Sequence, residues 1–405
     1  MELSYLIDAA SMLLRWLHLI VGIAWIGASF YFVWLDNSLK PPTDPKLIED
    51  GVGGELWAMH GGGFYNPQKY ANTPKHLPED LHFFFWPSYT TWITGFLLIS
   101  VMYYFQAATF MVDPSVSSIT PAQSVGIGIA TLVIGWVVYD QLARLLIERS
   151  QLLFAVLYVA FVTLVAFTLT HLLAGRAAYI HVGAMIATTM SANVFFWIIP
   201  AQRRQVAVMK QGGEVPAIWG KRAKQRSYHN NYLTLPVLFA MISNHYASTY
   251  SHPHAWAVLI LIMLGAVLIR HFFNLRHKGV YRWEFPIVGM AIILGVLVWI
   301  APKPHPQAVA PASGTAASTA PAAPTLDEIT KIAVERCSGC HAEHPTIMPV
   351  AQMGVMLDTP ERVKQHAQRI YERAVQLKNM PLANMTKMTD DERARIAAWY
   401  AAGAK

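Results

Sequence analysis

Long runs of apolar residues separated by polar connections dominate residues 1–301 of the chain. An α-helix needs about 20 mostly apolar residues to cross the hydrocarbon core of a bilayer. Eight runs are predicted as spans, and they cover residues 13–35, 83–105, 125–147, 152–173, 178–199, 233–246, 255–273 and 285–300. The pattern therefore predicts an all-α fold, in which a polytopic membrane bundle of about eight transmembrane helices occupies residues 1–301.

Composition agrees with this pattern. The chain is 54% hydrophobic and 14% charged, and its mean hydropathy of +0.33 is too high for a soluble protein of this size. The first apolar run starts close to Met1 and is not followed by a small-residue cleavage site, so we expect it to be retained as an anchor.

Lysine and arginine are concentrated in alternate connections. They occur in the connections 36–82, 200–232 and 274–284, whereas 111–122 and 247–254 contain none. Because positive connections stay in the cytoplasm, both termini are predicted to face outward. We therefore expect a multi-pass protein of the bacterial inner membrane, whose C-terminal part is periplasmic. The net charge of +7 then mostly reflects the orientation of the spans in the membrane, and a nucleic-acid partner is not expected.

The last quarter of the chain differs from the rest. Residues 302–325 are rich in proline, alanine, serine and threonine, a composition that is typical of a linker without a core. Residues 326–405 have balanced charges, and helices are expected over 360–377 and 389–402. We expect a small all-helical cytochrome c domain here.

The two cysteines of the chain form the motif Cys337-Ser338-Gly339-Cys340-His341. Thiols at this spacing can reach both vinyl groups of one porphyrin, and the adjacent imidazole can bind the iron. A redox dithiol needs a βαβ context and a zinc site needs more ligands, so one covalent haem c is favoured.

The second axial ligand of this haem should be a thioether from a later loop. Met380, which precedes Pro381 and follows the expected helix 360–377, is the prediction. Met385 and Met388 are the nearest alternatives, whereas Met348 follows the motif too soon to reach the other face of the ring.

An internal repeat appears in the membrane domain. A shift of 163 residues aligns His18 with His181 and Trp34 with Trp197. Histidines inside a membrane are costly, and neutral imidazole is a common haem ligand, although such residues can also simply bond across helices. We predict a haem b in this domain, with His18 and His181 as the first ligand pair and His171 and His245 as further candidates.

The connection between the first two spans contains His60-Gly61-Gly62-Gly63-Phe64-Tyr65-Asn66-Pro67-Gln68-Lys69-Tyr70. Glycines permit close approach of a ligand, and the polar side chains offer stacking, hydrogen bonds and a positive charge. The segment predicts a site for a planar anion, with substrate contacts from Tyr65, Asn66 and Gln68 and a catalytic base in His60 or Lys69. The alternative is a flexible turn followed by a polar loop.

Asn230 and Asn231 precede the sixth apolar run. Adjacent carboxamides can pair with the edge of a heterocycle such as a purine, or they can cap a helix. Both residues are predicted substrate contacts.

With these segments in view, the chain resembles the bacterial membrane-bound urate hydroxylases (urate oxidases) of the PuuD type with a fused cytochrome c domain. The resemblance is carried by residues 15–37, 60–70, 229–246, 337–341 and 380–393. It implies oxidation of urate to 5-hydroxyisourate, with electrons passing through the cytochrome to a downstream respiratory oxidase or soluble cytochrome. The first span is also similar to haem-carrying membrane proteins of the protoporphyrinogen-oxidase and copper-resistance types.

Two other functions fit the same motifs. One is a quinol:cytochrome c electron-transfer protein, which would take its electrons from within the membrane. The other is a purine transporter with a cytochrome appendage, which should have broken helices and a polar site at mid-membrane depth.

Overall fold

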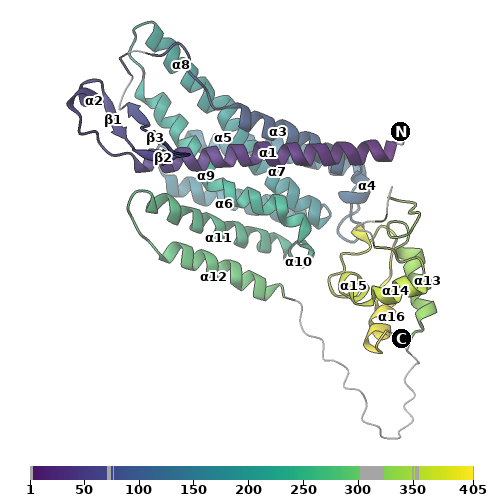
Figure 1. The fold of residues 1–405 in the computed structure, drawn as a ribbon. Helices are drawn as coiled ribbons and strands as arrows, with labels where there is room; N and C mark the ends of the chain where they lie inside the picture. Colours follow the sequence, from purple (N-terminus) through teal and green to yellow (C-terminus); the bar gives the residue numbers. More distant parts are fainter. Residues whose placement is uncertain are drawn as a thin grey trace.

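The computed structural model describes residues 3–70, 74–75, 77–301, 323–348, 351 and 355–404. Long helices form one bundle over residues 3–301, and a smaller helical domain follows it (Figure 1). Apart from four short strands, the regular structure of the described residues is helical. The predicted all-α class is confirmed.

Eight main helical stretches make the bundle. They are α1 (Leu3–Ser38), α3 (Trp86–Ile99) with the π-helix η1 (Ser100–Tyr104), α5 (Pro121–Leu146), α6 (Gln151–Thr170), α7 (Gly175–Asn193) continued by η2 (Val194–Ile198) and α8 (Ile199–Lys210), α9 (Ala217–Ile242), α11 (Ala255–Arg276) and α12 (Glu284–Trp299). Short elements in the connections are α2 (Pro45–Glu49), α4 (Ala107–Phe110), the 3-10 turn η3 (Ser243–His245) and α10 (Ala247–Tyr250).

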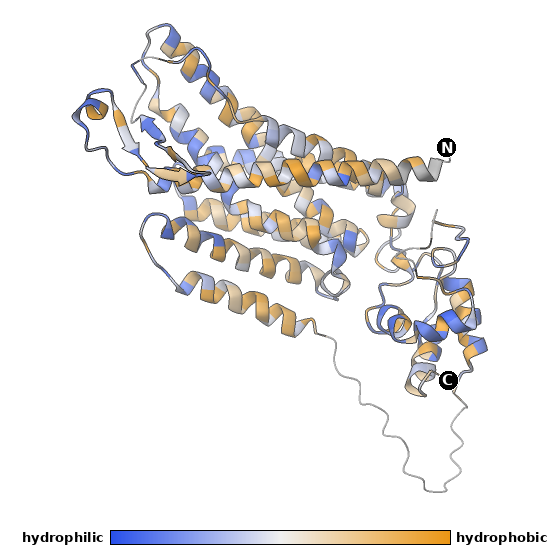
Figure 2. Ribbon diagram, viewed as in Figure 1, coloured by the Kyte–Doolittle hydropathy of each residue, from blue (hydrophilic) through white to orange (hydrophobic). Residues whose placement is uncertain are grey.

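Successive helices alternate in direction, because short connections return the chain beside the helix it has just left. The bundle therefore has two ends. One end carries the C-termini of α1 and α5 and the four short strands that follow α1, and we call it the hairpin end. The opposite end, which carries the N-termini of α1 and α5, is called the far end. Helix α7 packs against both α5 and α9 and is buried along most of its length, so it forms the centre of the core. Hydrophobic residues line the helices between the two ends (Figure 2).

Five of the helices are long and apolar enough to cross a membrane: Ala9–Ser38, Pro121–Leu146, Gln151–Thr170, Gly175–Lys210 and Ala255–Arg276. The other three predicted spans also correspond to helices. However, α3 has 14 residues before η1 continues it, α12 has 16, and α9 begins with a polar half. The structure is thus compatible with a membrane protein.

The connection after α1 folds into two small antiparallel pairs. Strand β1 (Val52–Glu55) pairs with β4 (Gln68–Tyr70), and β2 (Ala58–His60) pairs with β3 (Gly63–Tyr65). Gly61 and Gly62 have φ angles of 58° and 82°, a conformation that favours glycine. Two of the three successive glycines therefore serve a tight hairpin turn.

The C-terminal domain contains α13 (Leu326–Arg336), α14 (Pro360–Gln365), α15 (Ala367–Ile370), the π-helix η5 (Tyr371–Gln376), the 3-10 turn η6 (Leu382–Asn384) and α16 (Asp390–Ala401). Helices α13 and α16 each begin with a capping box, in which a threonine and a glutamate bond reciprocally to backbone N–H groups. Trp399, Ile329 and Ile396 lie in its core. The predicted linker 302–325 lies outside the described residues up to residue 322.

Candidate functional site

Helix α9 brings polar side chains into the bundle at the hairpin end. Asn230 and Asn231 are 5% and 0% exposed, so both are inside the protein. Asn230 bonds to residues of α7, whereas Asn231 bonds to α11. The two adjacent carboxamides therefore belong to different clusters on two sides of α9.

The first cluster, which we call the Arg270 site, lies between α1, α9 and α11. Arg270 donates from Nε to Asn231 Oδ1 at 2.9 Å, and its guanidinium lies 3.9 Å from the ring centroid of Phe30 on α1. Arg270 is 5% exposed, and among the described residues no carboxylate pairs with it. A buried charge without a counterion costs several kcal/mol, so this arrangement favours a bound anion.

Unpaired hydrogen-bonding atoms surround Arg270. Within the described chain, Asn231 Nδ2, Arg270 Nη2 and both side-chain atoms of Asn274 are buried without a hydrogen-bond partner. Such groups are rare in folded proteins because each loses its bonds to water. Together they offer donors on three residues and one amide acceptor, which suits a ligand with carbonyl and N–H groups along one edge.

Cationic side chains, which we call the cationic mouth, lie beside the Arg270 site at the hairpin end. Tyr228, one turn before Asn231, donates to Asn37 Oδ1 at 2.9 Å. The ammonium groups of Lys224 and Lys278 each lie 5.8 Å from the Tyr228 ring centroid. Lys224 pairs with Asp36 at 2.7 Å, and Lys69 pairs with the same carboxylate.

The charges of this region do not cancel. Four cations, Lys69, Lys224, Lys278 and Arg270, stand against the single carboxylate of Asp36 in these contacts. Burial lowers the pKa of the Lys69 ammonium, and the nearby Lys224 charge lowers it further. The mouth therefore attracts anions and contains a lysine that releases its proton more easily than a free one.

The second cluster, between α5, α7 and α9, is a closed hydrogen-bond network. Asn193 donates from Nδ2 to Tyr139 Oη at 3.0 Å and to Asn230 Oδ1 at 2.9 Å. Tyr139 Oη lies 2.8 Å from His229 Nδ1. Arg226 pairs with Asp140 at 2.9 Å. Since these charges and amides satisfy one another, the network fixes the packing of α9 against α7.

The residues predicted in the loop 60–70 are placed separately. Asn66 donates to Glu55 Oε2 at 2.9 Å, and Gln68 donates to Asn66 Oδ1 at 2.9 Å, so both bond within the strand pairs. His60 and Tyr65 are exposed on the β2–β3 hairpin. Lys69 reaches the mouth through Asp36, and Asn231 lies in the Arg270 site.

The sequence prediction missed Arg270 and Asn274. The signal was present in the spacing, because Arg270 and Asn274 lie one turn apart on one face of α11 and Lys278 follows four residues later, just past its end. These residues were read only as part of an apolar span and a positive connection. Polar residues at four-residue spacing in the last two turns of an apolar helix could have identified Arg270 and Asn274.

Histidines predicted as haem b ligands lie nearer the far end. His18 Nδ1 is 3.0 Å from Thr94 Oγ1 of α3, and its ring packs against Gly95. His181 is 0% exposed, and its Nε2 is buried without a partner in the described chain, while Nδ1 donates to Ala177 O at 2.8 Å.

The two histidines have different neighbours. His18 faces α3, whereas His181 faces α5, where a Cβ on Gly128 would lie 2.5 Å from Nε2. A backbone hydrogen bond from Nδ1 is the orientation that a ligating imidazole uses, so His181 suits an axial ligand. A porphyrin at this nitrogen requires α5 and α7 to separate. His171 and His245 are exposed.

We expect a pyridine haemochrome of purified protein to show haem b and haem c in equal amounts. His181→Ala should lose the haem b signal and keep haem c, because a buried imidazole nitrogen without a hydrogen-bond partner is removed from the core of the bundle. The control His171→Ala, an exposed residue at the end of α6, should keep both. Haem c alone in the unmodified protein would exclude an intramembrane haem.

The cysteine motif forms a turn directly after α13. The backbone N–H groups of Cys340 and His341 both donate to Cys337 O, at 3.1 and 2.9 Å, so the chain continues as a helical turn that brings the motif together. The two cysteines form no disulfide with each other, and burial raises the pKa of the Cys337 thiol to about 12. A thiol of raised pKa is a poor redox nucleophile, because the thiolate is the attacking form.

Other features of the motif suit haem c. His341 Nδ1 lies 3.2 Å from Val355 O, the bond that orients an iron-ligating imidazole. In the described part of the chain, no group of three or more His, Cys, Asp or Glu could hold a metal ion without a cofactor. The residues present therefore fit a covalently bound haem.

Among the candidate sixth ligands, Met388 is 3% exposed and lies in the hydrophobic core of the domain. Met380 and Met385 are half-buried. The carbonyl of Met380 accepts from Arg393 Nη1 at 2.9 Å, which fixes the backbone of this loop. Met380 stays the predicted ligand, and Met388 packs in the core of the domain.

Comparison with known proteins gives one match. Residues 4–301 match the model of a family described as urate oxidase N-terminal. Neither the curated proteins nor the solved structures contain a significant match.

Proposed function

The chain belongs to the urate oxidase N-terminal family, and from that premise we propose that it oxidises urate to 5-hydroxyisourate at the Arg270 site, with a haem c in the C-terminal domain as electron acceptor. The observation that carries this proposal is the buried Arg270, which lacks a carboxylate and is surrounded by unpaired amide groups. Urate at neutral pH is a planar monoanion with carbonyl and N–H groups around its rim.

Binding would complete the bonds that the site lacks. Arg270 Nη2 and Asn231 Nδ2 donate to carbonyl oxygens of urate, and Asn274 both donates to and accepts from its edge. These atoms are out of contact with solvent, so urate reaches them after α1 moves aside. Only 6% of the spanning window of α1 is buried by the rest of the protein, the lowest share among the five possible spans, so its displacement uncovers the fewest buried residues.

The reaction must balance protons as well as electrons. Urate monoanion and one water give neutral 5-hydroxyisourate, two electrons and one proton. Of the two predicted bases, Lys69 pairs with Asp36 at the mouth, whereas His60 lies on the β2–β3 hairpin. We infer that Lys69 accepts the proton from its neutral form, which its lowered pKa makes more accessible. Asn231 and Asn274 hold the ring while water adds to the oxidised carbon.

Haem c, when bound, supplies a one-electron acceptor. The C-terminal domain approaches the far end of the bundle, where η6, which follows Met380, contacts α4 (Figure 1). We propose that a haem b on His181 connects the two ends. From the lysines and arginines at the hairpin end we further infer that urate binds on the cytoplasmic side and that the cytochrome faces the periplasm of a bacterial inner membrane.

Anaerobic addition of urate to the purified protein is expected to reduce haem c. Because each urate gives two electrons, one equivalent of urate per chain should reduce one haem b and one haem c, or two haem c groups if the chain holds no haem b. The measurement is the absorbance of reduced haem c in a sealed cuvette. Xanthine, which lacks the third carbonyl of urate, serves as the control.

Two outcomes would contradict the proposal. If urate is consumed only with dioxygen and haem c stays oxidised, the electron route is wrong. If a quinol reduces haem c quickly and urate does not, the protein is a quinol:cytochrome c electron-transfer protein.

A further inference from the structure

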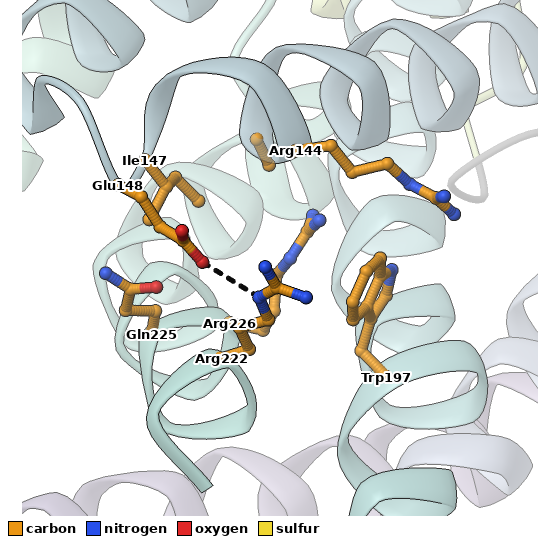
Figure 3. A pocket seen from close by; sticks show the side chains of 8 residues that line it. Arg144, Ile147, Glu148, Trp197, Arg222, Gln225 and Arg226 are labelled. Carbon is orange, nitrogen blue, oxygen red and sulfur yellow. Dashed lines mark hydrogen bonds and ion pairs between the residues drawn. The ribbon is translucent and has the colours of Figure 1, made fainter. Parts of the chain in front are cut away.

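A pocket of about 240 Å³ opens at the hairpin end, on the side of α9 away from the Arg270 site (Figure 3). It lies between the end of α5, η2 and the first turns of α9. Its polar lining consists of Arg144, Glu148, Trp197, Arg222, Gln225 and Arg226.

Positive charge is in excess in this pocket. Asp140 accepts from Arg144 at 2.7 Å and from Arg226 at 2.9 Å, and Glu148 accepts from Arg222 at 2.8 Å. Three guanidinium groups thus stand against two carboxylates. Arg144 and Arg222 each use Nε for these bonds, and in the described structure their terminal Nη groups have no hydrogen-bond partner. One net positive charge with free donors suits a singly charged oxyanion.

The indole of Trp197 is already in contact with other side chains of the protein. The guanidinium carbons of Arg144 and Arg226 lie 4.9 and 4.6 Å from its centroid, and its Nε1 donates to Asp140 at 2.7 Å. It therefore has little surface left on which a purine could stack. The ligand of this pocket should be held by charge and hydrogen bonds and not by an aromatic face.

Apolar side chains beside the pocket are exposed. Leu145 on α5, Leu152 at the start of α6 and Phe196 of η2 are 59%, 75% and 58% exposed. Helices α5, α6 and α7 with its continuation are among those that can cross a membrane. A ligand whose anionic group binds in the pocket, at the edge of such a surface, can extend apolar chains into the hydrocarbon core of the membrane.

We propose that this pocket binds the phosphodiester headgroup of an anionic phospholipid, whose acyl chains lie along the exposed apolar residues of α5 and η2. Arg144 and Arg222 contact the phosphate, and the buried Arg226 fixes Asp140, which positions Arg144. The lipid is a structural ligand of the hairpin end and is distinct from the substrate of the Arg270 site.

Native mass spectrometry of the full chain, with phosphatidylglycerol or phosphatidylcholine as probe, tests the proposal. We expect one phosphatidylglycerol to be retained per chain after delipidation, and a dissociation constant at least about tenfold lower than that for phosphatidylcholine, a difference of ~1.4 kcal/mol. The double variant Arg144→Gln/Arg222→Gln should lose this preference. The matched control, Arg204→Gln/Lys210→Gln, removes two exposed charges from α8 and should keep it.

Several results would overturn the proposal. Equal retention of the two lipids by the unmodified protein, a measurement that needs no variant, excludes a headgroup site. Unchanged lipid preference in the double variant places the lipid elsewhere. Displacement of phosphatidylglycerol by urate would assign the pocket to substrate, whereas failure of urate to reduce haem c leaves the lipid result unaffected.

Discussion

Arg270→Gln is expected to lower kcat/KM for urate by about 100-fold. The substitution removes charge-assisted hydrogen bonds to the anion, and a loss of ~3 kcal/mol in transition-state binding corresponds to that factor. The thermal stability of the same variant should be unchanged or higher, because a buried charge without a carboxylate is removed. Steady-state kinetics with urate and a thermal unfolding scan measure the two effects.

Arg226→Gln is the matched comparison. Arg226 is 3% exposed, but it pairs with Asp140, so its loss leaves a buried carboxylate with one fewer partner. We expect this variant to lose ~3 kcal/mol of stability, with urate binding retained in the fraction that folds. If Arg270→Gln is equally destabilised and keeps full activity, then Arg270 has a packing role and the substrate site lies elsewhere.

Cys337→Ala/Cys340→Ala should abolish electron exit from the protein. Without both thioether bonds the haem is not covalently attached, and turnover with the natural acceptor is expected to fall at least about 100-fold, which is ~2.7 kcal/mol of activation free energy. Haem staining of a denaturing gel should show no covalent haem. Equilibrium binding of urate should remain, since the Arg270 site lies in the bundle.

Ser338→Ala is the control for this variant, because it changes the motif at a position that forms no bond to the porphyrin. It should keep haem staining and turnover. Turnover that persists in the double cysteine variant would show that electrons leave the membrane domain directly to another acceptor.

Much of the fold could be predicted from the spacing of apolar residues. A helix surrounded by lipid or by the protein core needs a continuous apolar run, and each of the eight predicted runs overlaps a helix over most of its length. Helices over 360–377 and 389–402 were also predicted, and the structure has α14, α15 and η5 in the first range and α16 in the second, whereas α13 was not predicted. The π-helical turns η1 and η2 were not predicted, since an extra residue in a helical turn leaves little trace in composition.

The candidate site was predicted only in part. Lys69 and Asn231 were selected for their chemistry, and the structure brings both to the same side of α9. Asn66 and Gln68 have the same chemistry but bond to each other and to Glu55, which spacing could not show. Arg270 was missed because an arginine near the end of an apolar helix usually marks only orientation.

The sequence by itself determined the helices, the chemistry of the cysteine motif and the concentration of positive charge at one end, because these depend on local runs and fixed spacings. Only the tertiary structure decided which polar residues face one another. The adjacent Asn230 and Asn231 point to different helices, since successive side chains on a helix differ by about 100° in direction. Because of that rotation, Asn230 belongs to the closed hydrogen-bond network with Asn193, whereas Asn231 lies beside Arg270, which has no carboxylate partner among the described residues.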